Sequence, residues 1–302
     1  MCLGRGTGPS RRGASAPAGV EGRPVAGTLP PPPPRGTFRA VSRRGISVED
    51  DARWVFNRLA DDYPARPGYP EELVVRLLGL GGGRGARVAE LGAGTGLLAL
   101  PLARAGARVQ AVEPARAMLA VLRALAGEQP ATRGPPDGAG AVTPVHAAAE
   151  DTGLPDSAFD LVVLADALHW VDAARAGREA ARLLAPGGVL AVATPRLATT
   201  PFLSELSALL AAANPRARAG PPPLGLLFGA AGLAAPATEA FLHQERLPPE
   251  RLDAVLRSLS LVGPALGPAR LAELLAAARA LAEAHGGATW RREIDLHWAR
   301  RR

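Results

Sequence analysis

The sequence predicts a doubly wound α/β domain built on a mostly parallel sheet. Short apolar runs, typical of buried parallel strands, alternate with helix-like segments between residues 84 and 196. The first run ends in a glycine-rich turn, Glu90 to Gly96, which leads into a helix. An acidic residue, Glu113, ends the second run, 21 positions after Gly92. This order of strand, glycine turn, helix, strand and acid is the layout of a nucleotide-type cofactor site.

The remaining elements follow from local signals in the sequence. The core strands are expected at residues 87–91, 107–112, 142–146, 158–164 and 189–194. Helices are expected at residues 50–59, 70–78, 97–105, 114–125 and 173–184, and a Gly/Pro-rich loop at 126–141. The last helix should end at Pro186-Gly187-Gly188, because proline and glycine do not continue a helix.

The segment from residue 197 to residue 302 is expected to hold substrate or lid elements. Residues 201–213 and 268–285 have the pattern of helices. The second of these shows one apolar face, formed by Leu271, Leu274, Leu275, Ala278, Leu281 and Ala282. Residues 239–247 and 289–298 alternate as strands do.

The first 45 residues are expected to form a disordered tail, so that the domain occupies residues 46–302. They combine Gly, Pro, Ser and Arg with a five-proline run, Pro30 to Pro34, and cannot bury enough apolar surface to fold. A transit peptide or a ligand for a proline-binding module are the alternative interpretations of this segment.

The net charge of +7 lies in this tail, which holds eight arginines and one acid. The rest of the chain balances 27 basic against 27 acidic residues, and every basic residue is arginine. A nucleic-acid-binding face is therefore not expected. The single cysteine, Cys2, excludes an internal disulfide, and no apolar run is long enough for a membrane span or a secretory signal. These features favour a cytoplasmic protein.

The spacing of the glycines separates two cofactors. The dinucleotide pattern G-x-G-x-x-G requires glycine at position 97, where Leu97 stands. The sequence instead has E-x-G-x-G-x-G, beginning at Glu90. This version, with its surroundings, resembles the class I S-adenosylmethionine (SAM) dependent methyltransferases, and in particular the bacterial small-molecule group of the "methyltransferase domain 11" type. The resemblance covers roughly residues 50–200 and rests on seven blocks in order: 66–70, 88–96, 111–114 with 118–119, 149–150, 159–163, 168–170 and 184–188.

This resemblance implies a Rossmann-like, seven-stranded sheet with helices on both faces, completed by an antiparallel pair from the C-terminal segment. It also implies SAM as the cofactor and no metal. Within the glycine turn, the backbone of Gly92, Ala93 and Gly94 should approach the methionine portion and the ribose, and Glu90 should orient the amino end. Glu113, followed by Pro114, should bind the ribose hydroxyls.

Further residues are assigned to the cofactor with alternatives left open. Met118 packs on adenine or belongs to the core. Ala149 with Glu150 binds adenine, unless Asp151 shares or replaces that role or Glu150 is an ordinary loop acid. Asp166 follows the fourth strand and should face the methyl donor. Asp160, at the start of that strand, is expected to be structural.

The acceptor side is expected to involve a cap and a loop. In the family, the segment before the first strand caps the cofactor, so Tyr63, Arg66 and Tyr69 either line the site or pack the turn. His169 is either a general base, since its unperturbed pKa is near 6.5, or a residue that fixes the loop. Trp170 either closes over the sulfonium by cation–π attraction or belongs to the core.

The function predicted from these residues is methyl transfer from SAM to a small molecule. A non-catalytic SAM-binding protein is the first alternative, because Ala193-Thr194-Pro195-Arg196 replaces the polar or aromatic acceptor-side motif frequent in the family. An oxidoreductase that uses NAD is disfavoured by Leu97, and a nucleic-acid methyltransferase by the neutral body of the chain. The sequence leaves the oligomeric state undetermined.

Overall fold

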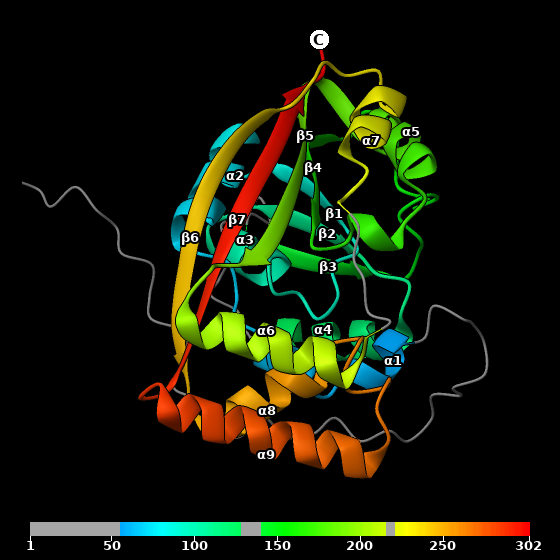
Figure 1. Ribbon diagram of the computed structural model, residues 1–302. Helices are drawn as coiled ribbons and strands as arrows, with labels where there is room; N and C mark the ends of the chain where they lie inside the picture. Colours follow the sequence, from blue (N-terminus) through cyan, green and yellow to red (C-terminus); the bar gives the residue numbers. More distant parts are fainter. Residues whose placement is uncertain (1–54, 128–139, 216–220) are drawn as a thin grey trace, which may run out of the picture. The chain divides into compact units, whose positions relative to one another are not determined.

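The computed structural model describes residues 55–127, 140–215 and 221–302, which all belong to one compact unit (Figure 1). The predicted tail at residues 1–45 and most of the predicted loop at 126–141 lie outside these ranges. So do residues 50–54 of the first predicted helix.

A single seven-stranded sheet organises the described chain, as predicted. Its order is β3-β2-β1-β4-β5-β7-β6, and β7 alone runs antiparallel to its two neighbours. This is the doubly wound arrangement, in which the chain starts near the middle of the sheet and reverses its direction of travel. The strands are β1 (Arg87–Leu91), β2 (Arg108–Val112), β3 (Ala141–Val145), β4 (Phe159–Ala165), β5 (Leu184–Leu197), β6 (Ala237–Leu247) and β7 (Ala288–Arg300).

Helices cover both faces of the sheet (Figure 1). On one face, α2 (Glu71–Leu80) and α3 (Ala99–Arg104) bury leucines against the strands. On the other, α5 (Ala173–Leu183) and α7 (Leu224–Ala230) enclose a second core. The remaining helices are α1 (Val55–Leu59), η1 (Tyr63–Ala65), α4 (Arg116–Gly127), η2 (Leu168–Trp170), α6 (Pro201–Ala213), α8 (Pro249–Arg257) and α9 (Pro268–Ala284).

The start of β5 corrects the sequence prediction. The strand begins at Leu184, immediately after α5, rather than at residue 189, and it includes Pro186. Its register against β4 shifts between the Phe159–Leu184 and Leu161–Val189 pairs, which marks a β-bulge. A bulge accommodates extra residues that a regular ladder cannot pair, so a proline here does not end the strand.

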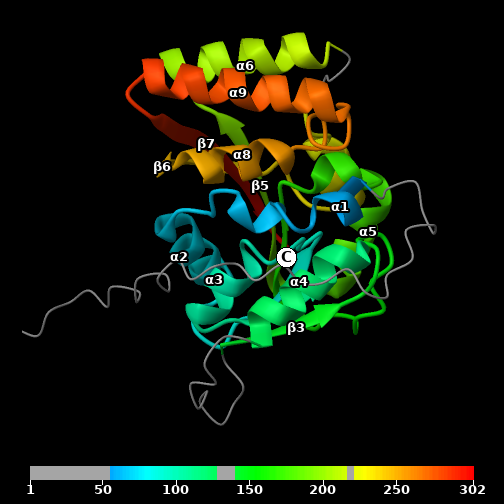
Figure 2. The same ribbon diagram turned by 90° about the horizontal axis from the view of Figure 1, so that it is seen from below.

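A third layer of helices lies at the carboxyl edge of the sheet. β5, β6 and β7 have 14, 11 and 13 residues, whereas β1, β2 and β3 have five each. The longer strands therefore extend beyond their neighbours. α6 follows β5, α8 follows β6 and α9 precedes β7, so all three helices meet at this edge. They enclose a separate core that includes Leu206, Leu256 and Trp290, and Figure 2 shows α6 beside α9.

None of the helices within the described ranges is both long and apolar enough to cross a membrane.

Candidate functional site

The glycine-rich turn after β1 is held in a conformation that only small residues fit. Gly92 has φ +81°, in the left-handed region that side chains disfavour. A Cβ at this position would lie 2.7 Å from the Cβ of Ala167. The amides of Gly92 and Ala93 both donate to the carbonyl of Val112, each with an N···O distance of 2.9 Å. These bonds tie the turn to the end of β2, so the ends of β1, β2 and β4 are brought together.

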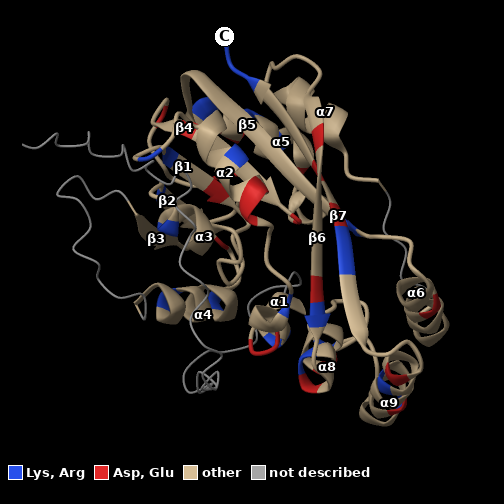
Figure 3. Cartoon of the chain, turned by 90° about the vertical axis from the view of Figure 1, so that its left-hand side faces the viewer, with Lys and Arg blue, Asp and Glu red and all other residues tan. Residues whose placement is uncertain are grey.

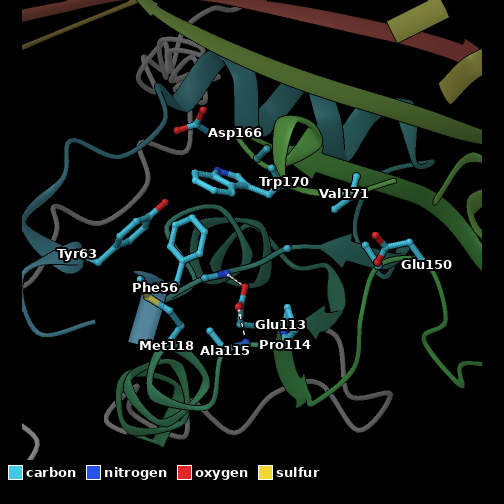
Figure 4. A pocket seen from close by; sticks show the side chains of 15 residues that line it. Phe56, Tyr63, Glu113, Pro114, Ala115, Met118, Glu150, Asp166, Trp170 and Val171 are labelled. Atoms are coloured by element: carbon cyan, nitrogen blue, oxygen red, sulfur yellow. Dashed lines mark hydrogen bonds between the residues drawn. The ribbon is translucent and has the colours of Figure 1, made fainter. Parts of the chain in front are cut away.

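Glu113, at the end of β2, is fixed by two backbone amides. Its carboxylate accepts hydrogen bonds from Gly94 N and Ala115 N, each with an N···O distance of 2.8 Å (Figure 4). Burial raises the pKa of Glu113, and the two amides oppose this shift. Each carboxylate oxygen has a second lone-pair direction. The carboxylate is therefore oriented by the protein and still has acceptor capacity for a ligand.

A pocket opens beside this carboxylate and encloses about 780 Å³, counting space that is open to solvent. The pocket brings together most of the predicted cofactor residues: Gly92, Gly94, Glu113, Pro114, Met118, Ala149, Glu150 and Asp166. Tyr63 and Trp170, predicted for the acceptor side, also line it.

Two predicted cofactor residues lie outside the pocket lining. Ala93 is buried in the core beneath the turn. Glu90 is also buried, at 2% exposure, and its Oε2 atom has no hydrogen-bond partner. Burial and the charge of Glu113 hold the pKa of Glu90 well above its usual range. Glu90 thus lies behind the turn as a carboxyl group with one free oxygen.

Phe56, which no sequence signal marked, forms part of an aromatic wall. The Phe56 and Trp170 rings meet edge-on at 4.8 Å, and Tyr63 lies 6.3 Å from Phe56 (Figure 4). The neighbouring Asn57 accepts a hydrogen bond of 2.9 Å from Ala117 N, which fixes α1 against the start of α4. Only the tertiary contact reveals this wall, because α1 and η2 are more than a hundred residues apart in sequence.

Arg66 contacts the pocket residue Asp166 from outside the lining itself. Its Nη1 lies 3.5 Å from Asp166 Oδ2 and 3.3 Å from the Tyr63 hydroxyl. Nε donates to the Ser258 hydroxyl and Nη2 to the Ser258 carbonyl, each with an N···O distance of 3.0 Å. The guanidinium also lies 4.3 Å from the centre of the Tyr63 ring, a cation–π distance. Arg66 therefore joins the pocket wall to the end of α8.

We call residues 62–69 the cap segment, which follows α1, and Figure 3 shows α1 near α8. The C-terminal elements hold the cap segment at several further points. Its residue Tyr69 lies outside the pocket lining, and Tyr69 stacks with the guanidinium of Arg292 at 5.8 Å. The additional contacts are Arg251 Nε with the Ala65 carbonyl at 2.9 Å, Arg257 with the Asp62 carboxylate at 3.1 Å, and Arg292 Nη2 with the Pro67 carbonyl at 2.8 Å. The cap segment is thus docked on α8 and β7.

Asp166 has an unusual backbone conformation. Its φ is +54°, which is uncommon for a residue other than glycine, although aspartate tolerates it better than most. Its amide donates to the Ala193 carbonyl over 2.9 Å, which holds the chain in place. Burial raises the pKa of Asp166, and the charges of Arg66, His169 and Arg292 oppose this.

His169 is exposed and lies outside the pocket lining. Partial shielding from water lowers its pKa, and the Asp166 carboxylate opposes the shift. Asp160 accepts hydrogen bonds from Arg87 N and Nε at the far end of β4, in agreement with the structural role predicted for it. Among the residues that the structure describes, no group of three or more His, Cys, Asp or Glu side chains is arranged to hold a metal ion.

Comparisons with known proteins agree with this geometry. Residues 89–192 match the family model of the methyltransferase domain. Uncharacterized methyltransferases of Mycobacterium bovis and Mycobacterium tuberculosis are 42% identical over 125 residues, which are 41% of this chain and 45% of each relative. The match therefore spans less than half the length of these relatives.

Solved structures give the same result for the fold. A candidate type II methyltransferase of Anaeromyxobacter dehalogenans is 27% identical, with a TM-score of 0.53 over 78% of this chain and 97% of that one. A candidate methyltransferase from an antibiotic biosynthesis pathway of Anabaena variabilis is 20% identical, with a TM-score of 0.53 over 75% and 96%. The chain thus has the Rossmann-like fold of these methyltransferases, and its residues 89–192 match the methyltransferase domain model.

Proposed function

We propose that this protein transfers a methyl group from SAM to a small-molecule acceptor. The observation that carries the proposal is the pocket at the ends of β1 and β2, where a fixed glycine turn faces a buried, oriented carboxylate. A family model for methyltransferases covers the same residues.

The residues present fit the parts of SAM. At Gly92 and Gly94 the absence of side chains lets a ligand approach the backbone, and the free acceptor capacity of Glu113 suits the two ribose hydroxyls. Met118, Ala149 and Glu150 lie along the same pocket toward β3, where adenine would extend. Glu90, expected to orient the amino end, is buried behind the turn with its Oε2 unpaired, so the turn's backbone lies between it and the pocket.

Bound SAM would supply an electrophilic methyl carbon on a good leaving group, and the chain's task is mainly to position the acceptor. Phe56, Tyr63 and Trp170 form an aromatic wall of the pocket, against which the donor would lie. Asp166 presents a carboxylate at the β4 end of the same pocket. A non-catalytic SAM-binding protein and an NAD-dependent oxidoreductase are the alternatives that experiment has to exclude.

Calorimetric titration with SAM, S-adenosylhomocysteine and NAD tests the cofactor. We expect the first two to bind and NAD not to bind. Glu113→Gln should weaken SAM binding ~10- to 100-fold, since a hydrogen bond to a charged group contributes ~1.5–3 kcal/mol. The control is Glu71→Gln, an exposed glutamate at the start of α2, which should bind SAM as the wild type does. NAD binding without a SAM response would refute the proposal.

Transfer itself is tested by incubating the protein with methyl-labelled SAM and a small-molecule extract of mycobacterial cells, the source suggested by the relatives. Label that moves from SAM to a new small molecule supports the enzyme. Intact SAM binding without transfer to any component of the extract supports the non-catalytic alternative.

A further inference from the structure

The end of β4 is the part of the pocket closest to where the methyl donor should lie. In the sheet order, β4 neighbours β1 on the side away from β2 and β3. If the ribose is bound at the end of β2 and adenine extends toward β3, the opposite end of SAM points toward β4. Asp166 is the charged pocket-lining residue at this end, and Figure 4 shows it well separated from Glu113 and Glu150.

Asp166 lines the pocket, and its carboxylate is not closed off by its ion-pair partner. Its side chain is 34% exposed, and its ion-pair distance to Arg66 is 3.5 Å, too long for a tight bidentate pair. The left-handed backbone at Asp166, fixed by the Ala193 carbonyl, holds the residue at this position. Backbone strain of this kind is concentrated at functional sites, where the surrounding structure maintains it.

The guanidinium of Arg66, by contrast, is bound by protein groups on all three of its nitrogens. Its Nε and Nη2 are bound to Ser258, and its Nη1 contacts the Tyr63 hydroxyl and Asp166. Ser258 is completely buried, and its hydroxyl also donates to the Val255 carbonyl over 2.6 Å. Because Ser258 caps the C-terminal end of α8, the negative end of the helix dipole further favours the guanidinium there. The charge of Arg66 therefore lowers the pKa of Asp166, and its guanidinium is not free to bind an anionic acceptor.

We propose that Asp166 binds the methyl acceptor by accepting a hydrogen bond from its N–H or O–H, and that Ser258 positions Asp166 through Arg66. The inference rests on the proposed function and names the class of acceptor atom: an amine, amide, alcohol or phenol rather than a carboxylate. An acceptor carboxylate would be repelled by Asp166, because like charges at hydrogen-bond distance destabilise each other.

The transfer balances with the residues present. The acceptor nitrogen or oxygen forms a bond to the methyl carbon, the carbon–sulfur bond breaks with its electron pair going to sulfur, and the acceptor proton passes to a carboxylate oxygen of Asp166. The other ionisable groups that act on Asp166 are Arg66 and Tyr63 of the cap segment, Tyr69, His169 of η2 and Arg292 of β7.

The chemistry of the product tests the acceptor class. After transfer from methyl-labelled SAM to the cell extract, products are treated with mild alkali, which releases methanol from methyl esters and leaves N-methyl and O-methyl ether products intact. We expect alkali-stable label. Volatile labelled methanol would overturn the inference and leave the proposed function standing. Absence of transfer despite SAM binding would remove the proposed function, and the inference with it.

Asp166→Asn tests the carboxylate, because asparagine has the same shape and also tolerates a positive φ. We expect turnover of the labelled products to fall ~10²- to 10⁴-fold, with S-adenosylhomocysteine affinity within about threefold of the wild type. The matched control is Asp160→Asn, which removes another aspartate–arginine pair at the opposite end of β4 and should keep full turnover. Unchanged turnover in Asp166→Asn, or an equal loss of cofactor affinity, contradicts the proposal.

Ser258→Ala tests the positioning role. Loosening Arg66 removes a positive charge from beside Asp166, so Asp166 should titrate at higher pH. The acid limb of the kcat/KM profile should then move to higher pH, by up to about one unit. Arg66→Gln should move it in the same direction and serves as the second variant if Ser258→Ala folds poorly. A lower melting temperature with the limb unmoved in both variants would show that Ser258 and Arg66 only stabilise the fold.

Discussion

Gly92→Ala separates the backbone requirement of the cofactor turn from its steric requirement. The change adds a single Cβ at φ +81°, 2.7 Å from the Cβ of Ala167. Gly85→Ala is a matched control, because Gly85 has φ +83° and nothing lies within 4 Å of its added Cβ. The two variants therefore share the cost of the left-handed backbone, and only Gly92→Ala adds the collision.

The left-handed backbone and the collision each lower the free energy of unfolding by a separate amount. A side chain in the left-handed region costs ~1–2 kcal/mol, which both variants should lose. Overpacking a close contact costs a further ~1–3 kcal/mol, so Gly92→Ala should lose ~2–5 kcal/mol in total. At ~2–4 °C per kcal/mol for a domain of this size, its melting temperature should lie ~2–12 °C below that of Gly85→Ala.

Thermal melting and calorimetric titration with SAM are the assays. Gly85→Ala should keep its SAM affinity, whereas Gly92→Ala should lose much of it, since Gly92 lines the pocket. In the double variant Gly92→Ala/Ala167→Gly the colliding Cβ is removed, so melting temperature should recover part of the difference. Equal melting temperatures and affinities for the two single variants would refute this reasoning.

Three further perturbations test other parts of the structure. Phe56→Ala removes the edge contact with Trp170, so SAM affinity should fall by ~2- to 10-fold, as expected for an aromatic pair, whereas the exposed Val75→Ala should leave it unchanged. Arg182 and Thr152 lower the pKa of Glu179 from 4.5 to about 2. The ionised Glu179 should therefore stabilise the fold fully above pH 4.5, and this stabilisation should disappear as the pH falls toward 2. Urea unfolding of wild type and Glu179→Gln across this range measures it, and a difference that is independent of pH would contradict the assignment. His169→Asn should lower turnover by less than the ~10²-fold expected for a lost general base, because the ring is exposed and outside the pocket lining; loss of the acid limb in the pH–rate profile would show otherwise.

Local sequence signals predicted the sheet and most of the residues that gather at the pocket beside the glycine-rich turn. Apolar runs marked the strands, and the long C-terminal strands proved to be the expected antiparallel pair. The Glu90–Gly96 pattern marked the turn, because glycine is the residue that tolerates the positive φ found at Gly92, Gly94 and Gly96. Glu113 could be placed because the strand–turn–helix–strand unit fixes the distance along the chain between the turn and the acid.

Only the tertiary structure decided which residues face the reaction. Glu90 and Ala93 belong to the same pattern as Gly92, yet both are buried outside the pocket lining. His169 and Asp166 are three residues apart, and the structure places only Asp166 in the pocket lining. Side-chain direction at irregular positions has no periodic signature in the sequence.

The wall of the pocket was also beyond sequence reasoning. Phe56 meets Trp170, and Arg66 meets Ser258, across 114 and 192 residues of chain. Neither pair has a spacing that marks it, since the contacts arise when α1 docks on α4 and the cap segment docks on α8. The sequence by itself determined the fold and the glycine-rich turn that we propose as the SAM site, because backbone conformation is encoded locally. The tertiary structure decided which side chains surround the pocket, because those side chains come from segments that only folding brings together.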